Sequence, residues 1–263
     1  MMELITNYLL QLVFSIGIIV VFGLLIMLCR RWFCNLMGPK GYKILLITGA
    51  VGTPIHELSH ALMCLIFGHK ITDMKLYQPD SDDGTLGYVN HSYNPKNLYH
   101  QIGNFFIGIA PIVCGNAFLL FLMALLVPDV FSDVGAAIAG VDPSFGGYIS
   151  VIPEIFAGIF SPSNFADWRW WIFLVLAIMV ASHMELSPAD IKGSVVGLLC
   201  ISGIVLVVDV LLFIISISAL EVVTEAFITF SAYMASFLVL SVFFLLLMVL
   251  VALAVSGIRN LRR

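Results

Sequence analysis

Long runs of apolar residues recur along this sequence, and they constrain its fold more than any other feature. A helix needs about 20 apolar residues to cross the hydrocarbon layer of a bilayer. Five runs reach that length, and a sixth is shorter but begins among tryptophans of the kind found at membrane interfaces. The six runs cover residues 8–29, 44–68, 102–127, 170–186, 193–220 and 226–257. The sequence therefore predicts an all-α polytopic membrane protein with about six transmembrane segments.

The composition agrees with a membrane location and excludes several classes of protein. Hydrophobic residues make up 61% of the chain and charged residues only 11%, whereas soluble domains have about half and a quarter. A soluble enzyme, a disordered chain and a nucleic-acid binder are therefore excluded. We expect a multi-pass protein of the cell membrane. Its sidedness stays open because basic residues follow both the first run, at Arg30 and Arg31, and the last.

The cysteines do not form a recognisable framework. There are five of them, an odd number, and no two have the C-x-x-C spacing of a metal or redox site. Most lie inside apolar runs, so we interpret them as small apolar residues of the membrane region. They are Cys29, Cys34, Cys64, Cys114 and Cys200.

Two stretches between the apolar runs are expected to have other structures. In residues 70–91, two segments rich in strand-forming residues flank the turn-forming sequence P-D-S-D-D-G, which predicts a small β-hairpin after the second transmembrane segment. The acidic turn lacks the glutamate that would close a calcium loop. Residues 134–160 are moderately apolar but interrupted by Pro and Gly, so we expect a re-entrant or interfacial segment there.

One cluster of ionisable residues lies inside the second apolar run. His56, Glu57 and His60 form the pattern H-E-x-x-H. On a helix, residues four apart share a face, so both imidazoles can bind one Zn²⁺ while Glu57 lies beside the water on the metal. Zinc lowers the pKa of that water toward ~7, and the glutamate can carry its proton to a leaving amine. The pattern therefore predicts a zinc site with the chemistry of peptide-bond hydrolysis.

A catalytic zinc needs a third protein ligand, which leaves the fourth position for water. Residues 182–193, between the fourth and fifth runs, contain His183, Glu185 and Asp190 around the helix-breaking Pro188. Asp190 is the preferred candidate because it is a carboxylate followed by an apolar helix. His183 and Glu185 remain alternatives.

Three features together resemble the site-2 protease family of intramembrane zinc metalloproteases. They are H-E-x-x-H in an early membrane helix, the pattern G-I-A-P-I-V-C-G-N at 108–116 in the next, and Pro188-x-Asp190 later. The resemblance covers about residues 44–193. The sequence departs from the family pattern after Asp190, where two residues precede Gly193, and where Ser182 or His183 replaces an upstream asparagine.

The resemblance implies a function and a set of site residues. His56, His60 and Asp190 would bind Zn²⁺, and Glu57 would act as general base and then general acid. Asn116 matches the asparagine of the third helix, and it and His183 are candidates for substrate binding or support of the ligands. The implied function is an intramembrane zinc metalloendopeptidase, whose partners are the lipid bilayer and a membrane-embedded or membrane-proximal protein or peptide substrate.

The resemblance also divides the chain into three regions. Residues 1–43 hold the first, retained transmembrane helix and a basic loop, residues 44–193 the metalloprotease core, and residues 194–263 the C-terminal helices. Asp209, in the middle of the fifth run, is interpreted as an inter-helix hydrogen-bonding residue rather than a proton relay. The predicted hairpin has an exposed edge to which an unwound substrate can add a strand.

Three other functions remain open at this point. A membrane zinc enzyme acting on a lipid-linked or small amide would use the same residues. A chaperone-like protein or carrier would retain the zinc as a structural metal. An ion transporter using Asp190 and Asp209 is the weakest alternative because the sequence lacks paired interrupted helices.

Overall fold

The computed structural model describes residues 1–82, 84–142 and 144–261, and it is 81% helical. The two strands, β1 (Lys70–Lys75) and β2 (Tyr88–Ser92), form one antiparallel sheet. The helical elements are α1 (Met2–Leu12), the π-helical η1 (Val13–Gly17), α2 (Ile18–Met37), α3 (Pro39–Ile66), α4 (Leu98–Leu126), α5 (Pro128–Ala139), α6 (Phe145–Ile159), the 3₁₀-helical η2 (Pro162–Ala166), α7 (Trp168–Ala181), α8 (Pro188–Ile215) and α9 (Ile217–Leu261). The predicted all-α class with one small hairpin is confirmed.

Four helical stretches of the described chain are long and apolar enough to cross a membrane. They are Met2–Met37, Leu98–Leu126, Pro188–Ile215 and Ile217–Ile258. The second and fourth predicted runs form α3 and α7, which fall outside this group. Polar and ionisable residues interrupt α3, and α7 has only 14 residues. The structure therefore supports four membrane-spanning helices in the described chain and leaves the predicted count of six untested.

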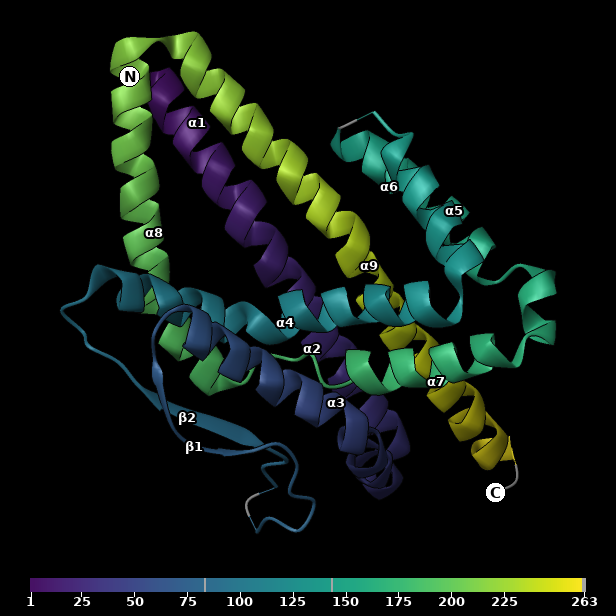
Figure 1. Cartoon of the computed structure of the whole chain (residues 1–263). Helices are drawn as coiled ribbons and strands as arrows, with labels where there is room; N and C mark the ends of the chain where they lie inside the picture. The colour runs from purple at the N-terminus through teal and green to yellow at the C-terminus, as the bar shows by residue number, and fades with distance from the viewer. Residues whose placement is uncertain (83, 143, 262–263) are drawn as a thin grey trace.

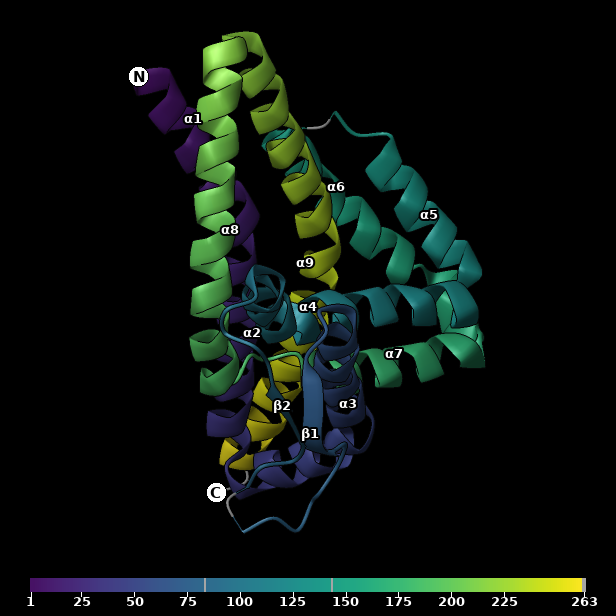
Figure 2. The same ribbon diagram turned by 60° about the vertical axis from the view of Figure 1, so that its left-hand side comes forward.

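The helices form two groups that cross each other, as Figures 1 and 2 show. The continuous rod from α1 to α2 lies beside α9, and α8 lies beside α1. Helices α3, α4 and α7 pack on one another across this first group, and α4 packs closely on α8. The hairpin lies against α3.

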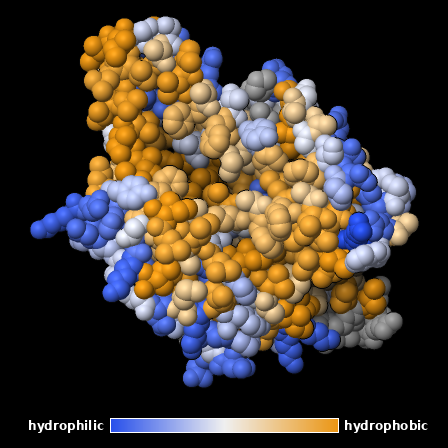
Figure 3. All heavy atoms as spheres, in the orientation of Figure 1, coloured by the Kyte–Doolittle hydropathy of each residue, from blue (hydrophilic) through white to orange (hydrophobic). Residues whose placement is uncertain are grey.

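Apolar side chains fill the interior and also cover much of the outside. Trp170 and Phe173 of α7 and Phe244 of α9 are fully buried, whereas Leu199 and Ile214 of α8 are 68% and 74% exposed. Hydrophobic atoms cover the upper left of the molecule, where α1, α8 and the start of α9 lie (Figure 3). An apolar outer surface of this kind fits lipid as the surrounding solvent.

Two predicted boundaries need correction. The fifth run does not continue to residue 220, because the extended backbone of Ser216 ends α8, and α9 begins at Ile217 rather than at residue 226. The predicted boundary followed the charges of Glu221 and Glu225, but both side chains are exposed and the helix continues through them. With 45 residues, α9 is about 68 Å long, more than twice the thickness of the hydrocarbon layer.

The two stretches between the apolar runs are now defined. Residues 134–160 contribute to α5 and α6, two helices that pack on each other and are each too short to span a bilayer alone. The predicted hairpin is present, with Ile71 opposite His91 and a register irregularity before Asp73. Its connection is long, and the backbone N–H of Gln78 donates to the carbonyl oxygen of Leu86 at 2.6 Å, which continues the pairing beyond the strands.

Glycines allow the close contact between α4 and α8. A Cβ at Gly197 of α8 would lie 2.6 Å from the carbonyl oxygen of Gln101. A Cβ at Gly108 of α4 would lie 2.6 Å from the carbonyl oxygen of Asp190. Small residues at helix contacts let backbones approach in this way, and here they bring the first turn of α8 to α4.

Candidate metal centre

Helix α3 carries both histidines of the H-E-x-x-H pattern on one face. The ring centroids of His56 and His60 are 4.8 Å apart, and their Nε2 atoms are 3.1 Å apart. The His60 side chain is 7% exposed and that of His56 13%. This pairing is the direct result of the four-residue spacing on a helix.

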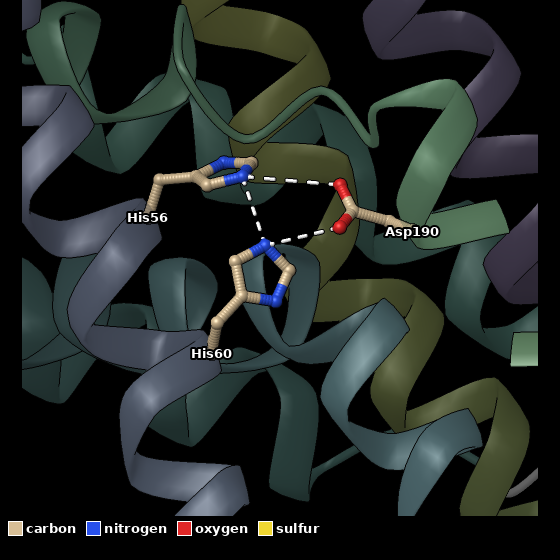
Figure 4. A group of neighbouring side chains, drawn as sticks. All are labelled: His56, His60 and Asp190. Atoms are coloured by element: carbon tan, nitrogen blue, oxygen red, sulfur yellow. Dashed lines mark hydrogen bonds and ion pairs between the residues drawn. The ribbon is translucent and has the colours of Figure 1, made fainter. Parts of the chain in front are cut away.

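Asp190 completes the cluster from the first turn of α8, as Figure 4 shows. Its Oδ1 lies 3.3 Å from Nε2 of His60, and its Oδ2 lies 4.0 Å from Nε2 of His56. A capping box fixes the aspartate. The backbone N–H of Ser187 donates to Oδ2 at 2.7 Å, and the backbone N–H of Asp190 donates to Oγ of Ser187 at 3.1 Å. The N-terminal end of the helix dipole also favours a carboxylate here.

The second nitrogen of each histidine is held by a backbone carbonyl. Nδ1 of His56 lies 2.7 Å from the carbonyl oxygen of His183, and Nδ1 of His60 lies 2.8 Å from that of Ile107 in α4. A carbonyl oxygen only accepts hydrogen bonds, so each Nδ1 carries the proton and donates it. In the neutral rings both Nε2 atoms are then unprotonated. Metal-binding histidines are oriented in this way.

The donor set fits a divalent cation. Two unprotonated Nε2 atoms and a carboxylate face one another, an arrangement that is repulsive until a cation lies among them. Ligand atoms about 2.0–2.1 Å from a tetrahedral Zn²⁺ lie roughly 3.3 Å from one another. The separations of 3.1 and 3.3 Å match this value, and 4.0 Å is moderately longer. Two imidazoles and one carboxylate are a donor set typical of catalytic zinc.

Glu57 lies beside the cluster, facing a cavity of about 310 Å³. His56 and Glu57 border this cavity together with loop residues 84–87, His183 and residues 185–188. The loop passes directly over the glutamate, since a Cβ at Gly87 would lie 2.8 Å from Cγ of Glu57. The Glu57 side chain is thus shielded from solvent, with open space next to the first histidine.

The other two candidates for the third ligand have different partners. The ring of His183 lies between two threonines of α3, with Nε2 3.0 Å from Oγ1 of Thr48 and Nδ1 3.3 Å from Oγ1 of Thr53. Glu185 forms an ion pair with Arg30 of α2. Of the three, the structure therefore brings only the side chain of Asp190 to the histidine pair, while His183 contacts His56 through its backbone carbonyl.

Two further residues singled out in the sequence lie away from the cluster. Asn116 is buried, and its Oδ1 accepts a hydrogen bond of 2.8 Å from Oγ of Ser241, which joins α4 to α9. Asp209 accepts a hydrogen bond of 3.0 Å from Nε2 of Gln11, which joins α8 to α1. The second contact agrees with the inter-helix interpretation of Asp209.

Several residues that support the site were missed in the sequence. The capping box had a readable signal, because S-x-x-D at residues 187–190 is a typical helix start. No local sequence pattern indicates the roles of Thr48 and Thr53, which contact the His183 ring, or of the Ile107 carbonyl, which contacts His60. Their roles depend on which helices pack together.

Comparison of the chain with models of known protein families, with curated proteins and with solved structures found no match.

Proposed function

We propose that this chain is an intramembrane zinc metalloendopeptidase that resembles the site-2 protease family. The observation that supports it most is the convergence of His56, His60 and Asp190, with Glu57 beside them, inside a largely apolar helical protein. The proposed substrates are membrane-embedded or membrane-proximal segments of proteins. In this proposal the protein is multi-pass and resides in the cell membrane, with α3 and α7 as membrane segments in addition to the four long apolar helices.

Each residue of the cluster has a defined task in the proposed reaction. His56, His60 and Asp190 would hold Zn²⁺, which supplies an activated water and polarises the carbonyl of the scissile bond. The Glu57 carboxylate takes a proton from the attacking water and then gives it to the leaving nitrogen. The carbonyls of His183 and Ile107 keep the imidazoles in the tautomer that presents Nε2.

The open space next to the cluster favours a catalytic metal over a structural one. Structural zinc sites are closed by four protein ligands, whereas catalytic sites keep one position for water or substrate. In the described part of the chain, three ligands converge here and the cavity at Glu57 adjoins them. A carrier or chaperone with a structural zinc is therefore the less favoured alternative.

Zinc content and peptide cleavage test this proposal together. The wild type, His56→Ala, Asp190→Ala and Glu57→Gln are purified in detergent and assayed with quenched fluorogenic peptides that carry transmembrane sequences. We expect about one zinc per chain in the wild type and Glu57→Gln and sharp loss in the two ligand variants. Cleavage by Glu57→Gln should fall by roughly 10²–10⁴-fold.

The matched control is Glu225→Gln, the same chemical change at an exposed position of α9, which should cleave as the wild type does. Folded wild type without zinc would overturn the proposal. Zinc in the wild type with cleavage unaffected by Glu57→Gln would exclude Glu57 as the base. Cleavage of lipid-linked or small amides in place of peptides would change the substrate class.

A further inference from the structure

A second cavity adjoins the metal cluster on the side of Asp190. It measures about 440 Å³ and lies between β2, the start of α4 and the start of α8. His91 of β2, Asn104 of α4 and Asp190 of α8 all line it. Neither His91 nor Asn104 has a part in holding the metal ligands, so their presence beside the cluster needs another explanation.

A chain of hydrogen bonds fixes the orientation of His91. Nε2 of His69 lies 2.9 Å from the carbonyl oxygen of His100, so this nitrogen donates and Nδ1 of His69 accepts. Nδ1 of His91 lies 3.0 Å from that acceptor and therefore donates to it. Burial lowers the pKa of both His69 and His91, which favours the neutral rings in this assignment. Nε2 of His91 is left as a hydrogen-bond acceptor.

Asn104 supplies the complementary group. Its side chain is buried, and within the described chain its Nδ2 has no hydrogen-bond partner. An unsatisfied buried donor costs about 1–3 kcal/mol, a cost that a bound acceptor would remove. Besides Asp190, Lys192 and Tyr93, the cavity is therefore lined by an acceptor on His91 and an unpaired donor on Asn104.

We propose that His91 and Asn104 bind one backbone peptide group of the substrate next to the metal cluster. A peptide group presents one N–H donor and one C=O acceptor, which matches the pair across the cavity. The N–H would donate to Nε2 of His91, and the C=O would accept from Nδ2 of Asn104. His69 is the positioning residue of His91. This inference rests on the proposed function and assigns two residues that bind the backbone of its peptide substrate.

The test uses binding rather than turnover. Protein loaded with Co²⁺ in place of zinc reports ligand binding at the metal through its visible absorption. Two probes are compared: acetohydroxamate, which reaches only the metal, and a dipeptide hydroxamate, which adds a backbone peptide group. The variants are His91→Phe and Asn104→Leu, which keep similar size and lose the polar atoms. The control is Asn90→Leu, at an exposed position of β2.

We expect each of the two variants to weaken binding of the dipeptide hydroxamate about tenfold, the effect of one lost hydrogen bond. Binding of acetohydroxamate and the cobalt content should stay at the wild-type values. His69→Phe should show the same selective loss, and His69→Gln, which keeps an acceptor, should restore much of it. Asn90→Leu should bind both probes as the wild type does.

The outcomes separate this inference from the proposed function. Equal effects on both probes, or lost metal, would make His91 and Asn104 supports of the metal site and overturn the peptide subsite. Unchanged binding of both probes would also overturn it. A folded wild-type protein that binds no metal would contradict the proposed function and, with it, this inference. Selective loss in a protein that cleaves no peptide would support the subsite while contradicting the hydrolase.

Discussion

At the scale of single residues, the position of the third metal ligand depends on the residues packed around it. Gly108 of α4 contributes only the absence of a side chain, yet this absence lets the backbone of Asp190 come close. The same first turn of α8 contains the capping box that aims the carboxylate. The position of the third ligand is thus set by packing at one glycine and by two hydrogen bonds with Ser187, one to its backbone N–H and one to its Oγ.

Gly108→Ala should therefore weaken zinc binding. The added methyl would overlap Oγ of Ser194 and lie 2.6 Å from the carbonyl oxygen of Asp190, and would push the first turn of α8 away from the histidines. Changes just outside a metal's ligands typically cost about 10–100-fold in affinity, and we expect a loss in this range. Zinc retention against a competing chelator measures it. Gly203→Ala, on α8 with no atom within 4 Å of the added Cβ, is the control. Equal retention in both variants would contradict the packing argument.

At the scale of elements, the hairpin is joined to the helical core through buried histidines. His69, between α3 and β1, is only 4% exposed, and its ring stacks on Tyr93 with centroids 4.9 Å apart. Burial lowers its pKa and that of His91 below the usual 6.5. Positive charge on His69 or His60 lowers the pKa of His91 further, whereas the negative charge of Asp190 raises it. Folding of the hairpin therefore favours the neutral form of both histidines.

This preference predicts loss of stability in acid. Below about pH 6.5, the histidines of the unfolded chain bind protons that those of the folded chain bind only at lower pH. Protonation therefore stabilises the unfolded state relative to the folded state. The thermal midpoint in detergent should fall as the pH drops from 7 toward 5. His69→Gln removes one of these groups, so its midpoint should fall less over the same range. Thermal melts of both proteins across this range measure the difference, and parallel curves would show that His69 does not carry the effect.

At the scale of the whole molecule, a buried cluster of polar side chains joins α1, α8 and α9. Nε2 of Gln11 in α1 donates to Oδ1 of Asp209 in α8 and lies 3.0 Å from Oγ1 of Thr224 in α9. All three side chains are buried. Thr224 also donates to the carbonyl of Leu220 within its own helix. These hydrogen bonds hold α1, α8 and α9 in register, and none of the three residues belongs to the metal cluster.

Gln11→Leu should destabilise this bundle by about 1–3 kcal/mol, because it leaves the Asp209 carboxyl buried without its donor. Gln11→Leu combined with Asp209→Leu should recover much of the loss, since no unpaired carboxyl then remains. Unfolding in mixed detergent micelles measures both, and zinc content should not change in either. A double variant less stable than Gln11→Leu would mean that the aspartate stabilises the bundle by another contact.

The sequence determined those features that depend on neighbours along the chain. Apolar runs predicted the helices and the membrane character, and turn-forming residues predicted the hairpin. The H-E-x-x-H spacing predicted the pairing of His56 and His60, because residues four apart must share a helix face. The S-x-x-D pattern at the start of α8 carried a signal for the orientation of Asp190 as well.

Tertiary structure decided what depends on contacts between distant segments. It brought the side chain of Asp190, and not that of His183 or Glu185, to the histidine pair because α8 packs on α4 at Gly108. It also placed His91 and Asn104 at one cavity and extended α9 through Glu221 and Glu225, whose charges predict a boundary there. Local periodicity specifies which residues form a helix and which face they share. Which helices meet, and where, follows from complementary packing over the whole chain, and no short window of sequence contains that information.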